Sequence, residues 1–271
     1  MSTQVGLVGV GEMGMAMLER MRAADIPVMV FARRPEVAAT AAGLGATLAG
    51  SGHELAAASD LVIVCVYTDD QVREVCLGPD GLVGAMRSGS VLLNHTTGSP
   101  DTPVALAADA APRGVRVLDA ALSGAPSDIR AGDLTLLVGG DPAVLAEVRP
   151  VLASYSDPIL SVGALGDGQR VKLLNNALFG AQVGLAADAE RVAVAMGLDP
   201  QLALAAVTHC SGDSRVLRIA NALGSPAVMR QQAARFIRKD VDMVLRTAAE
   251  QGYDLGWLGT AARHGPGPET G

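Results

Sequence analysis

The stretch that decides the fold is Val5-Gly6-Leu7-Val8-Gly9-Val10-Gly11-Glu12-Met13-Gly14. Its apolar start predicts a short buried strand, and the G-x-G-x-x-G spacing predicts a tight turn that opens a helix. In such a motif the first glycine permits the turn, the second leaves room for a pyrophosphate, and the third lets helix and strand pack closely. Free N–H groups at the helix start favour phosphates. We therefore expect a dinucleotide site rather than a ligand-free glycine-rich turn. Its expected cofactor-binding residues are Gly9, Val10, Gly11, Glu12, Met13 and Gly14.

Short apolar runs alternate with helical stretches over the first 160 or so residues. The helical stretches include Met13–Ala24 and Thr102–Ala111. The apolar runs contain few alternating polar residues, which is typical of strands buried on both faces of a parallel sheet. This alternation predicts an α/β fold with a Rossmann-like, doubly wound sheet. The expected strands are Val5–Val8, Val28–Phe31, Leu61–Val66, Val91–Leu93, Val115–Leu118 and Leu134–Val138.

The pattern changes after Gly163. A long helix without proline is expected from Gly168 to Met196, and Gly197-Leu198-Asp199-Pro200 predicts its end and a new helix start. The remainder is expected to be helical, with a frayed tail over residues 263–271. We therefore predict a dinucleotide-binding domain over residues 1–162 and an all-helical domain over residues 163–271, to which the family resemblance described below assigns substrate binding and dimerisation.

Composition excludes several classes of protein. Of the 271 residues, 49% are hydrophobic and 18% charged, which is enough apolar material for a core. A net charge of −7 and 3% aromatic residues argue against nucleic-acid binding. Three cysteines, no basic N-terminal region and no long apolar stretch favour a cytoplasmic protein that does not bind membranes. The four histidines are widely spaced, so no metal site is expected.

The end of the second predicted strand indicates which dinucleotide binds. An NAD site usually carries Asp or Glu there to hold the ribose 2′-hydroxyl. This chain has Phe31-Ala32-Arg33-Arg34-Pro35 instead. Guanidinium groups suit a phosphate by charge and by geometry. We therefore expect NADP (NADPH) as cofactor, with Arg33 and Arg34 near its 2′-phosphate; the alternative for either arginine is a solvated loop charge.

Three further segments carry a family resemblance. They are Asp119-Ala120-Ala121-Leu122-Ser123-Gly124-Ala125, Gly166-Asp167-Gly168-Gln169-Arg170-Val171-Lys172-Leu173-Leu174-Asn175-Asn176, and Phe236-Ile237-Arg238-Lys239-Asp240. Together with the glycine motif and its Met13, they resemble the β-hydroxyacid dehydrogenase family, which includes 3-hydroxyisobutyrate dehydrogenase. The resemblance implies an NAD-binding domain like that of 6-phosphogluconate dehydrogenase. It also implies hydride transfer between NADP(H) and a short 3-hydroxy acid or the corresponding semialdehyde.

The resemblance makes Lys172 the acid/base and Asn176 the residue that orients it or bonds the substrate oxygen. The two are four residues apart, so they share one helix face. Lys172 is the only lysine before Arg238. A partly desolvated lysine near positive charge can have its pKa lowered toward neutrality, which suits proton transfer. The alternative is a lysine that extends from an interdomain helix into solvent.

The resemblance also implies a substrate loop. Ser123, Gly124 and Ala125 match the family loop that holds the substrate carboxylate through backbone N–H groups and a serine hydroxyl. The family has proline and glycine where this chain has Ala121 and Ala125, so we expect a changed pocket. A plain glycine-containing turn is the alternative.

Further cofactor contacts are implied near the sheet's carboxyl edge. Thr97 matches a family hydroxyl residue beside the nicotinamide ribose; its alternative is the N-cap of the next helix. Val66, Tyr67 and Thr68 take the place of the family's Leu-Pro after the fourth strand. Lys239 matches a family lysine that reaches the cofactor end of the cleft, with a surface charge as the alternative.

Other activities and assemblies stay open at this stage. Imine reductases share the architecture but usually carry Asp or Tyr where Lys172 stands. 6-Phosphogluconate dehydrogenase itself is disfavoured because its helical domain is much longer. A non-catalytic NADP-binding scaffold is the third reading, and the retained Lys172 argues against it. Family members usually continue into a further helix, and their subunits often complete each other's pockets. We therefore expect a homodimer or higher homo-oligomer that binds a small acidic substrate.

Overall fold

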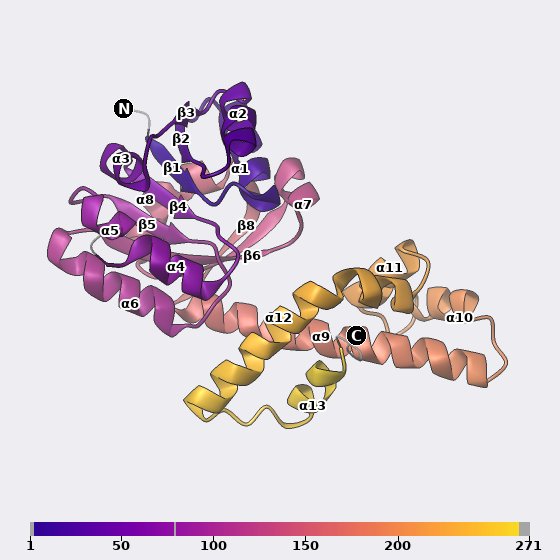
Figure 1. Cartoon of the computed structure of the whole chain (residues 1–271). Coiled ribbons are helices and arrows are strands. Elements are labelled where there is room, and N and C mark those ends of the chain that lie inside the picture. The colour runs from indigo at the N-terminus through magenta and orange to yellow at the C-terminus, as the bar shows by residue number, and fades with distance from the viewer. Residues whose placement is uncertain (1–2, 79, 266–271) are drawn as a thin grey trace. The chain divides into compact units, whose positions relative to one another are not determined.

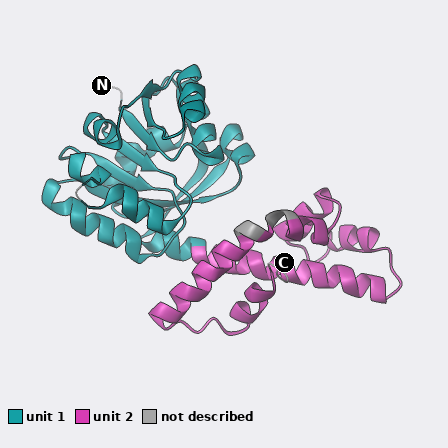
Figure 2. Ribbon diagram, viewed as in Figure 1, with its two compact units in different colours: residues 1–172 teal, residues 173–271 magenta. Residues whose placement is uncertain are grey.

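The structure is a computed structural model (Figure 1) that describes residues 3–78 and 80–265, without the side chains of residues 232, 233, 235 and 236. The frayed tail predicted for residues 263–271 therefore falls largely outside the described residues. The chain divides into two compact units, residues 1–172 and 173–271 (Figure 2). Unit 1 is an α/β unit and unit 2 is helical, which confirms the predicted fold class.

Unit 1 is built on one eight-stranded sheet with the strand order β3-β2-β1-β4-β5-β6-β7-β8. The first six strands run parallel, as predicted for the five of them that the sequence analysis identified, whereas β7 runs antiparallel to β6 and β8 runs parallel to β7. The prediction that the whole sheet is parallel is therefore wrong. The ten residues between β6 and β7 are too few for a crossover, which needs a dozen or more, but they can join antiparallel neighbours. The strands are β1 (Val5–Val8), β2 (Val28–Phe31), β3 (Thr47–Leu48), β4 (Leu61–Val64), β5 (Val91–Asn94), β6 (Arg116–Ser123), β7 (Leu134–Gly139) and β8 (Ser156–Gly163).

Helices cover both faces of this sheet (Figure 1). One core cluster joins the sheet to α1 (Glu12–Ala23), α2 (Pro35–Gly43), α7 (Pro126–Ala131) and α8 (Pro142–Leu152). The other joins it to α3 (Gly52–Ala58), α4 (Asp69–Cys76), α5 (Leu82–Ala85) and α6 (Asp101–Ala110), which the short 3-10 helix η1 (Ala111–Arg113) follows. Strands β1, β4 and β5 are buried along their whole length. The sheet is therefore doubly covered, which is why its strands carry near-continuous apolar sequence.

The sequence analysis did not predict two of the strands, β3 and β8. Strand β3 has only two residues, both exposed, so it carries no apolar signal. Strand β8 is an exposed strand at the end of the sheet and contains Pro158, a residue that edge strands tolerate and that usually argues against a strand. Strand β6 also extends five residues beyond the predicted end, through Ser123, because those residues pair with β7.

Unit 2 begins within α9, a helix of 29 residues over Asp167–Ala195. The predicted end and restart are confirmed: Gly197 adopts a positive φ of 76°, and Asp199 caps the next helix by accepting the Leu202 N–H at 3.0 Å. The other helices of this unit are α10 (Pro200–Val207), α11 (Arg215–Ala222), α12 (Pro226–Gln251) and α13 (Gly256–His264). A core of α9, α11 and α12 side chains, with Leu204 and Ala262, holds the unit together. Across the part of the chain that the structure describes, no helix is long and apolar enough to span a membrane.

Candidate active site

The predicted dinucleotide motif forms the turn between β1 and α1. Gly9 has a φ of +95°, and a Cβ there would collide with the Cys65 carbonyl oxygen, so only glycine fits. Gly11 is the N-cap of α1. A Cβ at Gly11 would meet no protein atom within 4 Å, so the packing of the chain does not itself require glycine there. Open space before a helix N-terminus is what an approaching phosphate needs, and this turn fits the group that the motif implies.

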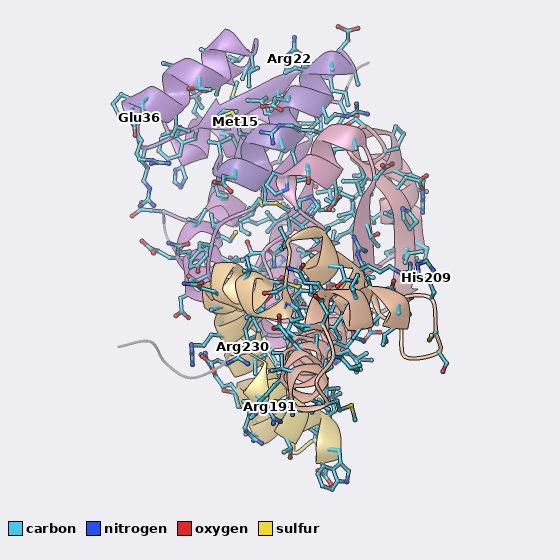
Figure 3. The ribbon with its side chains drawn as sticks, turned by 90° about the vertical axis from the view of Figure 1, so that its right-hand side faces the viewer. Met15, Arg22, Glu36, Arg191, His209 and Arg230 are labelled. Carbon is cyan, nitrogen blue, oxygen red and sulfur yellow. The ribbon has the colours of Figure 1, made fainter. Side chains whose placement is uncertain are left out.

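A cavity of about 430 Å³ lies beside this turn. Its walls include Arg34, which the sequence analysis selected, and Arg130, which it did not. Arg130 comes from α7 and pairs with Glu19 of α1 at 2.7 Å. Arg34 is exposed and lies 3.7 Å from Glu36. The cavity therefore brings one predicted cation and one further cation to the motif. Its lining is Val10, Gly11, Glu12, Met15, Arg34, Pro126 and Arg130. Figure 3 labels Met15 of this lining and Glu36, which lies near Arg34.

The residues after β4 and β5 are tied together at the carboxyl edge of the sheet. The Thr96 hydroxyl accepts the Val66 N–H and donates to the Val66 carbonyl, both at 3.0 Å. The N–H groups of Tyr67 and Thr68 both donate to Gln71, and Thr68 caps α4. These bonds fix the backbone of the segment expected to contact the cofactor.

Thr97, the predicted ribose contact, directly follows this tie and is half-buried. Helix α6 begins at Asp101 with Pro100 at its N-cap, so the alternative role of Thr97 as the cap of that helix is wrong.

A buried histidine lies under the same edge. His95 Nδ1 is 2.6 Å from the Ala120 carbonyl oxygen and Nε2 is 2.8 Å from the Tyr155 hydroxyl. A carbonyl can only accept, so Nδ1 carries the hydrogen and Nε2 accepts from the tyrosine. Burial lowers the pKa of His95 from its ordinary 6.5 to about 4, although the bond to Ala120 opposes the change. His95 is therefore a neutral structural residue.

The start of α9 is anchored on β6. Asp119 is fully buried, and its carboxylate accepts the N–H groups of Gly166 at 2.7 Å and Gln169 at 2.8 Å. Burial raises the pKa of Asp119, whereas these two bonds lower it. Lys172 follows three residues after Gln169 on the same helix and is half-buried. The motif that the sequence analysis selected thus forms the first turns of α9, against the middle of β6.

Asn176 lies one turn further along α9, in unit 2. Its side chain is 5% exposed, and its Oδ1 accepts from Asn175 at 3.2 Å. Its buried Nδ2 has no hydrogen-bond partner among the described residues. An unpaired buried donor costs about 1–3 kcal/mol, so it is usually kept where a ligand can satisfy it. The side chain fits the predicted role of bonding a substrate oxygen.

The predicted substrate loop joins β6 to α7. Ser123 ends β6, and Gly124 has a φ of +146° with the Asp128 side chain packed against it. The Ala125 N–H donates to Asp128 Oδ2 at 2.7 Å. One of the backbone donors expected for a substrate carboxylate is therefore engaged by a carboxylate of the chain itself. Sequence analysis missed Asp128, although an aspartate three residues after a helix N-cap is a recognisable capping signal.

The structure collects the predicted cofactor residues in unit 1 with one exception. Lys239 lies on α12 of unit 2 and is half-buried. The substrate loop and Lys172 also belong to unit 1, whereas Asn176 belongs to unit 2. Among residues 3–78 and 80–265, no three His, Cys, Asp or Glu side chains form a group that could hold a metal ion.

Two family models match the chain. The NAD binding domain of 6-phosphogluconate dehydrogenase matches residues 4–163, and the NAD-binding domain of NADP-dependent 3-hydroxyisobutyrate dehydrogenase matches residues 166–264. The two models meet just before α9.

Individual relatives agree with the family models. A 3-hydroxyisobutyrate dehydrogenase of Pseudomonas aeruginosa is 31% identical over 256 residues, covering 91% of this chain and 85% of the relative. An L-threonate dehydrogenase of Cupriavidus necator is 29% identical over 258 residues, covering 94% and 86%. The solved structure of Mycobacterium tuberculosis 3-hydroxyisobutyrate dehydrogenase with L-serine has a TM-score of 0.87 at 28% identity, covering 97% of this chain and 91% of that one. The chain belongs to the 3-hydroxyisobutyrate dehydrogenase-like, or β-hydroxyacid dehydrogenase, family of NAD(P)-dependent oxidoreductases.

Proposed function

We propose that the protein transfers a hydride between NADP(H) and a short 3-hydroxy acid or the corresponding semialdehyde, with Lys172 as the acid/base. The observation that carries this proposal is the placement of Lys172 in the first turns of α9. Hydrogen bonds tie that helix start to Asp119 in the middle of β6 and to the segment after β5, at the carboxyl edge where open α/β sheets bind their ligands. The half-buried lysine lies one helical turn after Gln169, whose side chain bonds the segment expected to hold the cofactor.

The chain's own residues would supply proton transfer and orientation. When bound, the dinucleotide accepts or supplies the hydride. In oxidation, the neutral Lys172 amine takes the hydroxyl proton while the carbonyl forms; in reduction, the ammonium returns a proton to the carbonyl oxygen. The unpaired Asn176 Nδ2 would donate to that same oxygen. Ser123 and the Gly124 N–H would hold the substrate carboxylate.

The preference for NADP(H) rests on charge at the end of β2. Arg33 and Arg34 stand where an NAD site usually has a carboxylate, and Arg34 lines the cavity beside the glycine motif. The family model that matches residues 166–264 is likewise named for an NADP-dependent enzyme. We expect a higher kcat/KM with NADPH than with NADH, and loss of that preference when both arginines are replaced by alanine.

We also infer a homodimer in the cytoplasm. Leu178, Leu185 and Val192 follow each other at seven-residue spacing on α9, and all three are exposed. This spacing places them on one helix face, as in helices that pair along an apolar seam. With only three cysteines, none of them in a disulfide within the described residues, the chain suits a reducing compartment.

The experiment that tests the proposal follows NADPH absorbance against a panel of small semialdehydes, 2-keto acids and cyclic imines. Lys172→Ala, with its cofactor affinity measured by fluorescence, is the control. Turnover of an acidic semialdehyde that falls at least about a hundredfold in the variant, at unchanged NADPH affinity, supports the proposal. Turnover of imines alone moves the protein to imine reduction. Tight NADPH binding with no turnover supports a scaffold.

A further inference from the structure

Gln169 is a fully buried residue to which the mechanism above assigns no role. Its side-chain amide bonds the backbone after β5 in two places. Oε1 accepts the Gly98 N–H at 2.9 Å, and Nε2 donates to the Thr96 carbonyl at 3.0 Å. The two bonds bracket Thr97, the residue expected to contact the nicotinamide ribose. One amide group thus fixes the backbone on both sides of that residue.

The main chain of Gln169 is tied in the opposite direction. Its N–H donates to Asp119 Oδ2 at 2.8 Å, while the other oxygen of that carboxylate accepts the Gly166 N–H. A Cβ at Gly168 would come within 2.5 Å of Asp119 Oδ2 and of the Leu137 carbonyl oxygen, so α9 starts in close contact with β6 and β7. The first turn of α9 is therefore held against the sheet by buried hydrogen bonds.

These ties join three parts of unit 1 through a single residue. Gln169 connects the segment after β5, the buried carboxylate of β6 and the first turn of α9. Lys172 is the next residue along that helix face, one turn later. Any shift of the Gln169 amide would move the Thr97 backbone relative to the lysine. A misplacement of about 1 Å can lower a rate about a hundredfold.

We propose that Gln169 is a positioning residue, which sets the spacing between the cofactor segment at Thr97 and the acid/base Lys172. This inference rests on the proposed function, because it needs Lys172 to move the proton. An amide is required because one planar group must accept from an N–H and donate to a carbonyl at the same time. Leucine would leave the Gly98 N–H buried and unpaired and would remove one of the two donors to the Thr96 carbonyl, which also accepts from Asn94 Nδ2 at 3.3 Å. A carboxylate would set an oxygen against that carbonyl.

Gln169→Glu gives the sharpest test, because a protonated carboxyl group reproduces both bonds. Its O–H donates to Thr96 and its carbonyl accepts from Gly98, whereas the ionised form can do only the second. The titratable groups near its partners are Asp119 of β6, which accepts the Gln169 N–H, Asp69 of α4, which packs against Gly98, and His95, which precedes Thr96 in the chain. On its own helix lie Asp167, Arg170 and Lys172. Burial and the two neighbouring carboxylates favour the protonated form, which brings its titration into a usable range.

We expect kcat of Gln169→Glu to be at least about tenfold below the unmodified protein near pH 8 and to recover most of that loss near pH 5.5. Gln169→Leu should show a similar loss at both pH values, and NADPH affinity measured by fluorescence should change no more than about threefold in either. The matched control is Gln201→Glu, the same change at an exposed position of α10, which should leave kcat and its pH profile unchanged.

Several results would overturn the inference. They are a kcat within about twofold of the unmodified protein in both variants, or a loss in Gln169→Glu that lowering the pH does not restore. If Gln169→Leu fails to fold by circular dichroism, the pH dependence of Gln169→Glu decides alone. Lys172→Ala, measured in parallel, separates this inference from the proposed function. Full activity in Lys172→Ala contradicts the proposed function, whereas an inactive Lys172→Ala beside a normal Gln169→Glu contradicts only the role of Gln169.

Discussion

At the scale of single residues, Asp128 changes what the loop from Ser123 to Ala125 can offer an acidic substrate. Its carboxylate occupies the Ala125 N–H and brings a negative charge to the loop. Two like charges a few ångströms apart near a protein surface repel by about 1–4 kcal/mol before screening by salt. Asp128 should therefore weaken the binding of a substrate carboxylate.

We predict that Asp128→Ala lowers KM for an acidic semialdehyde about tenfold and leaves KM for a neutral aldehyde of similar size unchanged. Asp133→Ala is the matched control, because it removes the same charge from an exposed position a few residues away. Steady-state kinetics with the two aldehydes measures the effect. A higher KM in Asp128→Ala, or an equal decrease in the control, would show that the carboxylate does not act on the substrate.

His95 makes the stability of the fold depend on pH. Its pKa falls from 6.5 in an unfolded chain to about 4 in the fold. Between these two pH values the unfolded chain binds the proton and the folded chain does not. The contribution of His95 to the unfolding free energy is therefore fully present above pH 6.5 and is lost as the pH falls toward 4. From this residue we expect about 2 kcal/mol less unfolding free energy near pH 5 than near pH 7.

Urea unfolding at both pH values checks this prediction, with His95→Gln as the comparison. The glutamine variant should lose the histidine's share of the pH dependence. The raised pKa of Asp119 acts in the opposite direction, but it is present in both proteins and cancels in their difference. An equal pH dependence in the two proteins would contradict the lowered pKa.

At the scale of elements, most of the parallel sheet could be predicted because each strand is a buried apolar run after a helix. The glycine motif also placed β1 and α1 to within a residue. The direction of β7 and the presence of β3 and β8 could not be predicted, since short or exposed strands depend on their neighbours and carry little apolar signal.

The site shows the same division. Lys172 and Thr97 could be selected from the sequence because each belongs to a short, continuous motif that resembles the family. Gln169 and Arg130 could not, because their roles come from partners distant in sequence, at Thr96 and Glu19 respectively. Buried hydrogen bonds across the sheet edge leave no periodic pattern in the chain.

Helix α9 carries the element-scale prediction, the inferred dimer. Leu185 is 61% exposed at the centre of the apolar face that Leu178 and Val192 share. We predict that the protein is a dimer and that Leu185→Glu dissociates it, because a pair of carboxylates would then be buried in the seam. Light scattering after size-exclusion chromatography measures the mass.

The matched control for this prediction is Leu202→Glu, which changes a 73% exposed leucine of α10. It should stay dimeric. A monomeric unmodified protein at micromolar concentration, or a dimer that only Leu202→Glu disrupts, would contradict the assignment of the α9 face.

At the scale of the whole molecule, the predicted site residues are distributed unequally between the two units. Unit 1 contains both core clusters of the sheet, the glycine motif, Arg33 and Arg34, the Thr97 segment and the substrate loop. Unit 2 contains two of the predicted site residues, Asn176 and Lys239. Binding of the dinucleotide should therefore need little beyond unit 1, whereas turnover should need both units.

Residues 1–172 expressed alone should consequently fold and bind NADPH, within about tenfold of the affinity of the full chain, yet reduce no substrate. The loss of Lys239 accounts for any weaker binding, and the loss of Asn176 removes the donor expected to meet the substrate oxygen. NADPH fluorescence titration measures the affinity. The same fragment with Gly9→Val serves as control, because its side chain would collide with the Cys65 carbonyl oxygen and should prevent binding. A folded fragment that does not bind NADPH would mean that unit 2 holds much of the cofactor. It would contradict the assignment of dinucleotide binding to unit 1.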